Sequence, residues 1–460
     1  MKILVTGATG TIGHDLCVSL LKSDHQVKIV TRRSETDLLK SWELPVEIVT
    51  WESPESTPFP KGNLDDVEAV IHLSGESINQ KWTDSAKQRI LNSRTKATQY
   101  LSQAIQEEGK NIKVFVGTSA IGIYPNSGTT PLNEKSDVDS SDAFLPMVCR
   151  KWEQASEDLS KHLRRVIIRV GLVLKVGEGF LGQLEPLYQK GVAGPIGMGQ
   201  RQMSWIHIDD LVRMFQTAVE DERFEGIYNG TAPQPVSNSQ FNEEFSKAMH
   251  LPNIAPVPPI ALKLLYGEMS ALALSDQKIL PEASLEHGFQ FHFTEIKQAF
   301  QDLYSWKTHY LDRRYYQWQW LNKDLDSTFE FFLSPYNLEQ ITPDFLNFKV
   351  LKSSTEKVEK NTKILYRISL RGIPMKWQTK ILEMIPNQCF IDNQEKGPYS
   401  KWHHIHRFES LKNGTYLTDE VTYRLPVGPL GSLFAGTFVK SDVSRIFRFR
   451  FEKLRKLVNH

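Results

Sequence analysis

Residues 1–13, MKILVTGATGTIG, decide the fold of the first part of this chain. Residues 3–5 are an uncharged apolar run, which is typical of a central strand in a parallel sheet. The run ends in a turn with glycine at positions 7, 10 and 13, and an apolar helical pattern follows as far as Leu21. The stretch therefore predicts a strand, a phosphate-binding loop and a helix.

Each glycine of this loop has a predicted role. Gly7 permits the sharp exit from the strand, Gly10 lets a pyrophosphate approach the backbone, and Gly13 lets the helix pack closely on the sheet. The amino end of the helix then faces the phosphates. A glycine triplet also occurs in turns for steric reasons alone. The predicted cofactor-binding loop further contains Thr9, Thr11 and Ile12.

The residues after the second strand predict which dinucleotide binds. Residues 27–31 read as a strand and complete a strand–helix–strand unit of about 30 residues, as the motif requires. An acidic residue at the end of this strand would bind the ribose of NAD, but the sequence has Arg32 and Arg33. Two guanidiniums suit a 2′-phosphate, so we predict NADP(H). The alternative is a solvated surface loop.

Length and composition limit the classes of protein. With 460 residues the chain is expected to hold two or three domains. Its 55 basic and 54 acidic side chains create no global field that would attract nucleic acid. Three scattered cysteines indicate reduced thiols. A strand that starts at residue 2 and the lack of a long apolar run predict a cytoplasmic protein without a signal peptide or membrane span.

Later apolar runs extend the predicted parallel sheet. Residues 46–49, 69–75, 114–119 and 164–171 read as buried strands, and residues 86–105 as a long helix. The strand over 69–75 ends in small residues that can lie against the adenine and ribose. The predicted cofactor contacts at these strand ends are Leu73, Ser74, Gly75 and Thr118.

The order of these motifs resembles the extended short-chain dehydrogenase/reductase superfamily. The resemblance covers residues 1–300 and rests on TGATGTIG, VIHLSG, VGTSAIGIY and WIHIDDLV. VCRKWE at 148–153, GPIGMGQRQMSWIHIDD at 194–210 and PPIALKLLYGEMSALALSDQKILP at 258–281 are similar to a subfamily described as nucleotide-sugar epimerases. The resemblance implies a Rossmann-like, doubly wound α/β domain with a small substrate lobe at about 177–203 and 226–300.

The resemblance also exposes a gap in the expected catalytic residues. In this superfamily a Ser or Thr binds the reacting oxygen, and a Tyr with Lys four residues later moves the proton. Ser119 fits the first role, but no tyrosine here has lysine four positions on. Aligned on Glu153, Leu145 replaces the tyrosine and Cys149 the lysine. Lys151 should point away, because two residues turn a helix by about 200°.

Three residues could replace the missing tyrosine, and one of them is Cys149, which could be a thiol acid or base or simply a small helix residue. Tyr124, five residues beyond Ser119, is our candidate proton donor, and shaping of the pocket is its alternative role. His207 could act as an acid or base, but its place on a short strand just before a helix favours a structural role. Asp209 or Asp210 is expected to cap the helix that follows.

A second module begins after a linker at 301–311. Beyond it strands alternate with loops, which predicts an antiparallel α+β domain over 312–460. Tyr316, Trp318 and Trp320 alternate with glutamines and predict a strand whose aromatic face is buried. Further strands are predicted at 363–371, 376–383, 388–393, 400–408 and 415–424. Residues 431–457 predict a long amphipathic helix with an apolar face of Phe434, Phe438, Val443, Phe447, Phe451 and Leu454.

This second module resembles the START-related helix-grip fold of polyketide cyclases and coenzyme Q-binding proteins. The similar phrases are SPYNLEQITP, QEKGPYSKWHHIHRF and GTYLTDEVTYRLP. The resemblance implies a cavity for an apolar or aromatic ligand between sheet and helix. The alternative is an aromatic core without a cavity.

His404 and His406 share one face of a predicted strand and could form a metal pair. The sequence shows no acidic or cysteine partner at ligand spacing. We therefore interpret them as cavity or surface histidines and predict no metal site.

Two hypotheses follow. The first is an atypical NADP-dependent oxidoreductase or epimerase-like enzyme that acts on a small carbonyl or hydroxyl compound, either a nucleotide sugar or a lipophilic molecule, with a hydrophobic-ligand module at its carboxyl end. The second is a non-catalytic NADPH-responsive binding protein, which the missing Tyr/Lys pair favours.

Overall fold

The computed structural model describes the whole chain except residues 192–193, 253–255, 261–263, 265–266, 371, 427 and 459–460. The predicted motif at 258–281 therefore lies partly outside the described residues. The chain divides into two compact units. The first unit comprises Met1–Ser41 and Val46–Ser305, and the second comprises Trp42–Pro45 and Trp306–His460.

A seven-stranded parallel sheet forms the centre of the first unit, in the order β11-β7-β5-β4-β1-β2-β3. The order reverses between β1 and β4, which is where doubly wound sheets bind their ligands. The strands are β1 (Lys2–Thr6), β2 (Gln26–Thr31), β3 (Glu47–Thr50), β4 (Ala69–His72), β5 (Val114–Ala120), β7 (Arg164–Val170) and β11 (Gly226–Gly230).

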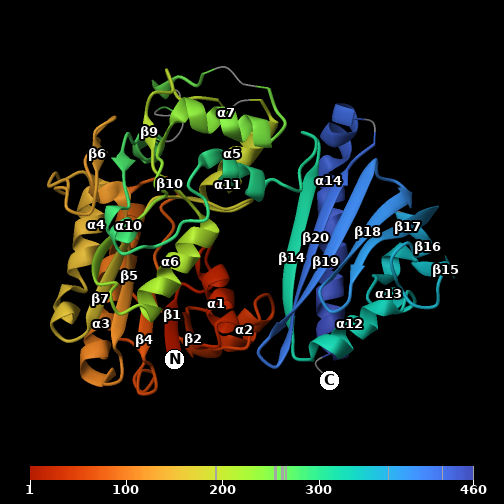
Figure 1. The fold of residues 1–460 in the computed structure, drawn as a ribbon, viewed down its shortest axis with the longest axis horizontal. Coiled ribbons are helices and arrows are strands. Elements are labelled where there is room, and N and C mark those ends of the chain that lie inside the picture. The colour runs from red at the N-terminus through yellow and green to blue at the C-terminus, as the bar shows by residue number, and fades with distance from the viewer. Residues whose placement is uncertain are drawn as a thin grey trace. The chain divides into compact units, whose positions relative to one another are not determined.

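Helices cover both faces of this sheet, so the predicted doubly wound α/β fold is confirmed. Figure 1 shows α3 and α4 on one side and α1 and α6 on the other. The helices are α1 (Gly13–Lys22), α2 (Glu35–Leu39), α3 (Asp84–Glu108), α4 (Phe144–Gln154), α5 (Gly179–Gln189), α6 (Ile208–Glu220), α7 (Asn238–Ala248), α9 (Ser270–Ala273), α10 (Glu282–Glu286) and α11 (Ile296–Leu303).

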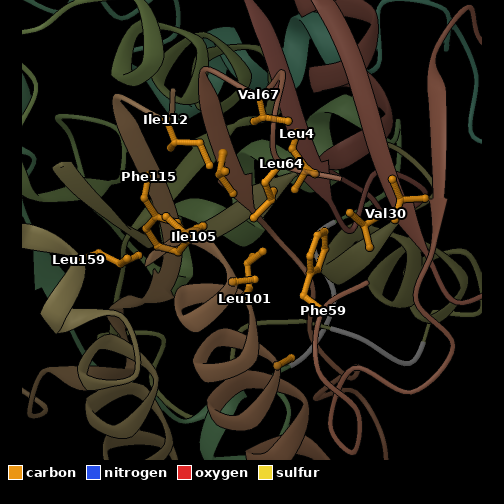
Figure 2. Packing of buried hydrophobic residues seen from close by; sticks show 14 of the residues in the cluster. Leu4, Val30, Phe59, Leu64, Val67, Leu101, Ile105, Ile112, Phe115 and Leu159 are labelled. Carbon is orange, nitrogen blue, oxygen red and sulfur yellow. The ribbon is translucent and has the colours of Figure 1, made fainter. Parts of the chain in front are cut away.

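The core on one face of the sheet joins strand and helix side chains. Figure 2 shows Leu4 and Phe115 from the sheet packed against Leu101 and Ile105 of α3. All four side chains are almost fully buried. Burial of such side chains contributes roughly 1.5–3 kcal/mol each, so this packing holds the strand ends in place.

Short strand pairs build the lobe beside the carboxyl ends of the sheet. They are β8 (Leu172–Leu174) with β10 (Trp205–His207), β9 (Gln202–Met203) with β12 (Val236–Ser237), and β6 (Pro131–Leu132) with β13 (Lys278–Ile279). The sequence analysis assigned residues 226–236 to this lobe, but Gly226–Gly230 is the edge strand of the main sheet. The pairing of this strand with β7 joins residues far apart in the chain, so no local sequence pattern predicted it.

The second unit contains a seven-stranded antiparallel sheet in the order β14-β20-β19-β18-β17-β16-β15. The predicted antiparallel α+β class is confirmed. The elements are β14 (Arg313–Leu321), α12 (Leu325–Leu333), α13 (Asn337–Gln340), β15 (Lys349–Ser353), β16 (Lys363–Leu370), β17 (Ile373–Ile385), β18 (Cys389–Lys396), β19 (Lys401–Leu411), β20 (Gly414–Arg424) and α14 (Gly428–Val458).

The long helix α14 packs on one face of this sheet, as the helix-grip resemblance implies (Figure 1). Val443 and Phe447 of its predicted apolar face are buried, whereas Phe438 is 58% exposed, contrary to prediction. The side chain of Phe434 lies outside the described residues. The apolar face therefore covers mainly the second half of the helix.

The inward face of β14 differs from the predicted one. Tyr315 stacks on Phe447 of α14, and Gln319 Nε2 donates to Phe451 O, so the odd-numbered residues face the helix. Trp318 lies on the opposite face and packs edge-on against Trp42. Alternation identified the strand correctly, but both faces are covered, so alternation could not show which one meets the helix.

Among the described helices, none combines the length and the apolar composition that crossing a bilayer requires.

Candidate cofactor and active site

The glycine loop packs backbone against backbone. Gly7 has a φ of +71°, and a Cβ there would lie 2.9 Å from the carbonyl carbon of Leu73 and the amide of Ser74. A Cβ on Gly13 would lie 2.2 Å from Gly7 O. A Cβ on Gly10 would approach only Gly7 O, at 3.3 Å. The loop is therefore held close to the end of β4, while the space above Gly10 is free of described side chains.

The amino end of α1 is suited to an anion. Its N-cap, Ile12, offers no side-chain cap, so no capping side chain competes with a ligand at this helix end, although the His14 amide already donates to Gly10 O at 3.3 Å. Lys175 holds the loop from the other side, because its Nζ donates to Thr11 O at 2.9 Å and pairs with Asp15 at 3.0 Å. Sequence reasoning missed Lys175, which is far from the loop in sequence.

His72 fixes the strand end that carries Leu73 and Ser74. The Thr6 Oγ1 atom accepts from the amides of both residues and lies 2.8 Å from His72 Nδ1. On the other side of the ring, Nε2 lies 2.9 Å from Thr98 Oγ1, which donates to a backbone carbonyl. Only one assignment of donors satisfies these contacts: Thr6 Oγ1 donates to His72 Nδ1, and His72 Nε2 donates to Thr98 Oγ1. His72 is therefore neutral and carries its proton on Nε2. Burial lowers the pKa of His72 to about 4, in agreement.

The two predicted arginines point to different places. Arg32 is exposed and lines a cavity of about 280 Å³ together with Glu76, from the end of β4, and Arg89 of α3. Arg33 instead donates through Nη1 to Ser41 Oγ at 3.2 Å. The structure therefore brings Arg32, but not Arg33, to a cavity at the crevice, and it adds Arg89 as a second guanidinium.

Ser119 lies at the carboxyl end of β5 with a buried, unpartnered hydroxyl. The residue is 1% exposed, and its Oγ has no hydrogen-bond partner among the described residues. An unsatisfied buried hydroxyl costs about 1–3 kcal/mol, so it calls for an explanation such as a ligand oxygen. Thr118, its neighbour, donates instead to His72 O at 3.0 Å.

Tyr124 is part of a buried polar network. Its hydroxyl donates to Asn229 Oδ1 at 2.9 Å and accepts from Arg169 Nη1 at 2.8 Å. Arg169 in turn forms a bidentate pair with Glu153, at 2.9 Å for both bonds. Burial raises the pKa of Tyr124. The phenol thus uses both its donor and its acceptor capacity inside the core.

Leu145 and Cys149, which the alignment on Glu153 puts in place of the Tyr/Lys pair, both lie close to the end of β5. A Cβ on Gly122, just after β5, would lie 3.7 Å from Leu145 Cβ. The Ala120 amide hydrogen-bonds the thiol of Cys149, and burial raises the pKa of that thiol to about 12. Cys149 is therefore a protonated thiol at neutral pH. Lys151 is exposed, as the helix geometry predicted.

A residue that sequence reasoning missed, Arg94 of α3, reaches this place. A Cβ on Gly75 would lie 3.1 Å from Arg94 Cζ, and the guanidinium stacks on Trp152 at 5.0 Å from the ring centroid. Its Nη1 donates to Glu76 O at 2.9 Å. Burial lowers the pKa of Arg94, while Cys149 interacts with it electrostatically. A half-buried cation therefore stands between the predicted cofactor contact Gly75 and the position of the absent lysine.

His207 has a structural position. It is the N-cap of α6, because its Nδ1 accepts from the Asp209 amide at 3.2 Å, and its ring stacks on Phe293 at 3.8 Å. The prediction that Asp209 or Asp210 caps this helix was wrong. Asp210 instead accepts from the amides of His292 and Phe293, a long-range contact that a local pattern cannot reveal.

Comparison with protein families divides the chain in the same way as the structure. Residues 3–146 match the NAD dependent epimerase/dehydratase family. Residues 257–303 match a domain of unknown function, DUF1731. Residues 322–449 match the family described as polyketide cyclase / dehydrase and lipid transport, which confirms the predicted resemblance of the second module.

Individual relatives match the first unit. The epimerase family protein SDR39U1 homolog of Arabidopsis thaliana is 33% identical over 303 residues, which are 65% of this chain and 85% of that protein. The epimerase family protein SAR0825 of Staphylococcus aureus is 33% identical over 305 residues, 66% of this chain and 99% of that protein. The crystal structure of human epimerase family protein SDR39U1 (isoform 2) with NADPH is 29% identical, with a TM-score of 0.60, and covers 66% of this chain and 99% of that chain.

Proposed function

Because this chain belongs, over the roughly two thirds of its length that align with these relatives, to the epimerase family, we propose that it is an NADP(H)-dependent oxidoreductase or epimerase-like enzyme. The substrate is a small carbonyl or hydroxyl compound, of the nucleotide-sugar or the lipophilic class. The observation that carries the proposal is the buried, unpartnered hydroxyl of Ser119 at the end of β5, on the same edge of the parallel sheet as the glycine loop that follows β1.

The cofactor proposal rests on the cavity that Arg32 lines. A dinucleotide whose diphosphate lies at the amino end of α1 would direct its ribose toward the end of β2, where Arg32 begins the loop. Arg32 and Arg89 on this cavity supply guanidiniums for a 2′-phosphate. The related human protein crystallised with NADPH supports the same preference. We assign Arg33 a weaker, longer-range electrostatic role, since it donates to Ser41.

Binding measurements on Arg32→Ala test this assignment. The affinity for NADPH should fall about 10- to 100-fold, as expected for the loss of a hydrogen bond to a charged group, while the affinity for NADH stays unchanged. Arg33→Ala is the matched control and should have a smaller effect. Isothermal titration calorimetry measures the affinities of the wild type and of both variants for NADPH and for NADH. An equal loss of NADPH and NADH affinity in Arg32→Ala would contradict the phosphate pocket.

The chemistry would be carried by Ser119 and Arg94. The bound cofactor supplies or accepts a hydride at the substrate carbon. We propose that the Ser119 hydroxyl donates to the reacting oxygen and that the Arg94 guanidinium stabilises the negative charge that develops there. A guanidinium does not release its proton at neutral pH, so the proton comes from solvent. Tyr124 positions the neighbouring backbone through Asn229 and Arg169, because its hydroxyl is already engaged.

Steady-state kinetics with a panel of aldehydes, diketones and nucleotide sugars test these roles. Ser119→Ala and Arg94→Ala should each lower kcat about 10²- to 10³-fold with NADPH binding retained. Lys151→Ala, an exposed change on α4, should leave kcat unaltered.

The competing proposal, a non-catalytic NADPH-responsive binding protein, is favoured by the missing Tyr/Lys pair. It predicts that the protein binds NADPH tightly and that no compound of the substrate panel causes oxidation of NADPH. That result would reject the enzyme and retain the cofactor site.

For the second unit we propose binding of an apolar or aromatic ligand. The match to polyketide cyclases and lipid transport proteins supports this, as does a cluster of aromatic rings formed by Trp377, Tyr399 and Trp402. Quenching of tryptophan fluorescence by aromatic polyketides or quinones would measure it, and Trp402→Ala should weaken the binding.

A further inference from the structure

Four ionisable side chains from three neighbouring strands of the second unit meet on one face of the sheet. Asp392 on β18 lies directly across from His404 on β19, and His406 on β19 lies directly across from Asp419 on β20. His404, His406 and Asp419 are 5%, 3% and 6% exposed. The ring of His404 lies 5.4 Å from that of Phe447, so this face is the one that α14 covers.

Each histidine ring lies between the two carboxylates. Asp392 Oδ2 is 3.3 Å from His404 Nδ1 and 3.2 Å from His406 Nε2. On the far side of the rings, Asp419 Oδ1 is 3.0 Å from His404 Nε2 and 2.7 Å from His406 Nδ1. The two rings are 3.7 Å apart between centroids. All four ring nitrogens therefore face a carboxylate oxygen.

The protons of two neutral imidazoles cannot satisfy these four contacts. Each neutral ring carries one proton, so two nitrogens present lone pairs to carboxylate oxygens. The contacts with hydrogen-bond geometry join His404 Nε2 to Asp419 and His406 Nε2 to Asp392, whereas His406 Nδ1, which faces Asp419, lacks a hydrogen-bond partner among the described residues. If the protonated nitrogens face Asp419, then three lone-pair donors converge on one point beside Asp392, and a cation at that point would bind all three.

We propose that Asp392 Oδ2, His404 Nδ1 and His406 Nε2 bind a divalent first-row transition metal ion of the zinc type. Two imidazoles and one carboxylate are a common ligand set for such ions. Ligand atoms about 2.0–2.1 Å from a tetrahedral ion are ~3.3 Å apart. The distances of 3.3 and 3.2 Å from Asp392 to the two histidines already have this value.

The surroundings complete such a site. Asp419 Oδ1 lies 3.0 Å from His404 Nε2 and 2.7 Å from His406 Nδ1, the ring nitrogens that face away from the ion. A carboxylate in this position orients metal-binding histidines and raises their basicity. Arg450 Nη1 lies 4.0 Å from Asp419 Oδ1 and offsets its charge. Phe390 stacks on His406 at 4.0 Å between centroids and shields the site. Sequence analysis found no acidic partner for the histidines, because both aspartates come from neighbouring strands.

Metal titration of the full-length chain tests the proposal. After removal of bound metal with a chelator, the protein is titrated with Co²⁺ and its visible absorption is recorded. We expect one Co²⁺ per chain, with the intense absorption of a low-symmetry site, and its displacement by one equivalent of Zn²⁺. Metal-free chain that keeps its circular dichroism spectrum and binds neither ion would overturn the proposal.

Variants locate the ion. His404→Gln and His406→Gln should abolish the Co²⁺ absorption, whereas His403→Gln should keep it, since His403 contacts Asn393 instead. Asp419→Asn should retain one ion per chain and weaken the affinity about 10- to 100-fold. Equal binding by His403→Gln and His404→Gln would overturn the assignment. If His404→Gln fails to fold, the Asp392→Asn variant and the titration of the wild type still test the proposed metal site.

Discussion

His72 shows how one side chain can order a cofactor-binding segment. Through Thr6 it is coupled to the amides of Leu73 and Ser74, two predicted cofactor contacts. Through Thr98 it is tied to α3. The network accepts only the neutral ring with its proton on Nε2, so protonation of His72 would remove the acceptor that Thr6 needs. The strand end is therefore expected to be sensitive to acid.

This gives a pH prediction. Burial lowers the pKa of His72 from its ordinary value of 6.5 to about 4. Between these values the unfolded chain binds the proton and the folded chain does not, so stability falls as the pH decreases from 6.5 to 4, by up to about 3 kcal/mol. Urea unfolding of the wild type and of His72→Gln at pH 7 and pH 4.5 measures the difference.

The stability of the first unit, measured from its urea-unfolding transition, should depend less on pH in His72→Gln than in the wild type. His162→Gln, which removes an exposed histidine of the same unit, should behave like the wild type. Equal pH dependence in all three proteins would contradict the buried neutral ring.

Arg94 and Ser119 illustrate two kinds of residue. Ser119 was found from its place after the fifth strand, which is a local feature. Arg94 lies in the middle of a long helix, where a lone arginine is ordinary, and only packing of α3 beside Gly75 and Trp152 suggests the role that we propose for it.

Among the elements, the strands were predicted better than their faces. The parallel strands of the first unit read as short apolar runs because both faces are covered by helices. In the second unit, β15 was missed because its exposed and buried residues do not alternate strictly. The inward face of β14 was inverted because aromatic residues cover its other face as well.

Asp312, which directly precedes β14, connects the start of that strand to the start of β19 and to the end of β20. Its carboxylate accepts from Arg424 Nε at the end of β20, from Lys401 Nζ at the start of β19, and from the Thr308 amide. The side chain is fully buried. Burial by itself would raise the pKa of Asp312, but the bonds from Arg424, Thr308 and Lys401 hold it well below its usual range.

Asp312→Asn should therefore destabilise the second unit by about 2–3 kcal/mol at pH 7, less than for a completely buried ion pair because Lys401 and Arg424 are partly exposed. Because the pKa of Asp312 is lower in the folded protein than in the unfolded chain, its carboxylate stabilises the fold at pH values above the unfolded pKa of about 4. This stabilisation is lost as the pH falls below that value. The gap between wild type and variant in urea unfolding should hence narrow toward pH 3.

Asp326→Asn, an exposed change, is the control and should shift stability by less than about 0.5 kcal/mol. A gap that stays constant with pH would show that Asp312 is not charged in the way proposed.

At the scale of the whole molecule, the described residues of each unit form large hydrophobic clusters of their own. Two-state unfolding is therefore not expected. A calorimetric scan should show two transitions. NADPH at 100 times its Kd should stabilise the first unit by about 2.7 kcal/mol and raise only the transition of that unit.

The Arg32→Ala variant is the control and should show a smaller NADPH-induced rise. If NADPH raised both transitions or neither, the assignment of cofactor binding to the first unit alone would be contradicted.

By itself the sequence determined the features that depend on neighbours along the chain. Glycine spacing and apolar periodicity predicted the two fold classes and the glycine loop, because backbone conformation and burial follow local patterns. The role of Ser119 was predicted from the resemblance of its motif to a family. The tertiary structure alone decided which polar groups meet. Strand pairing and helix packing brought Arg94 to Gly75, and Asp392 and Asp419 to the two histidines, because contacts between residues far apart in the chain depend on register and packing, which no local pattern encodes.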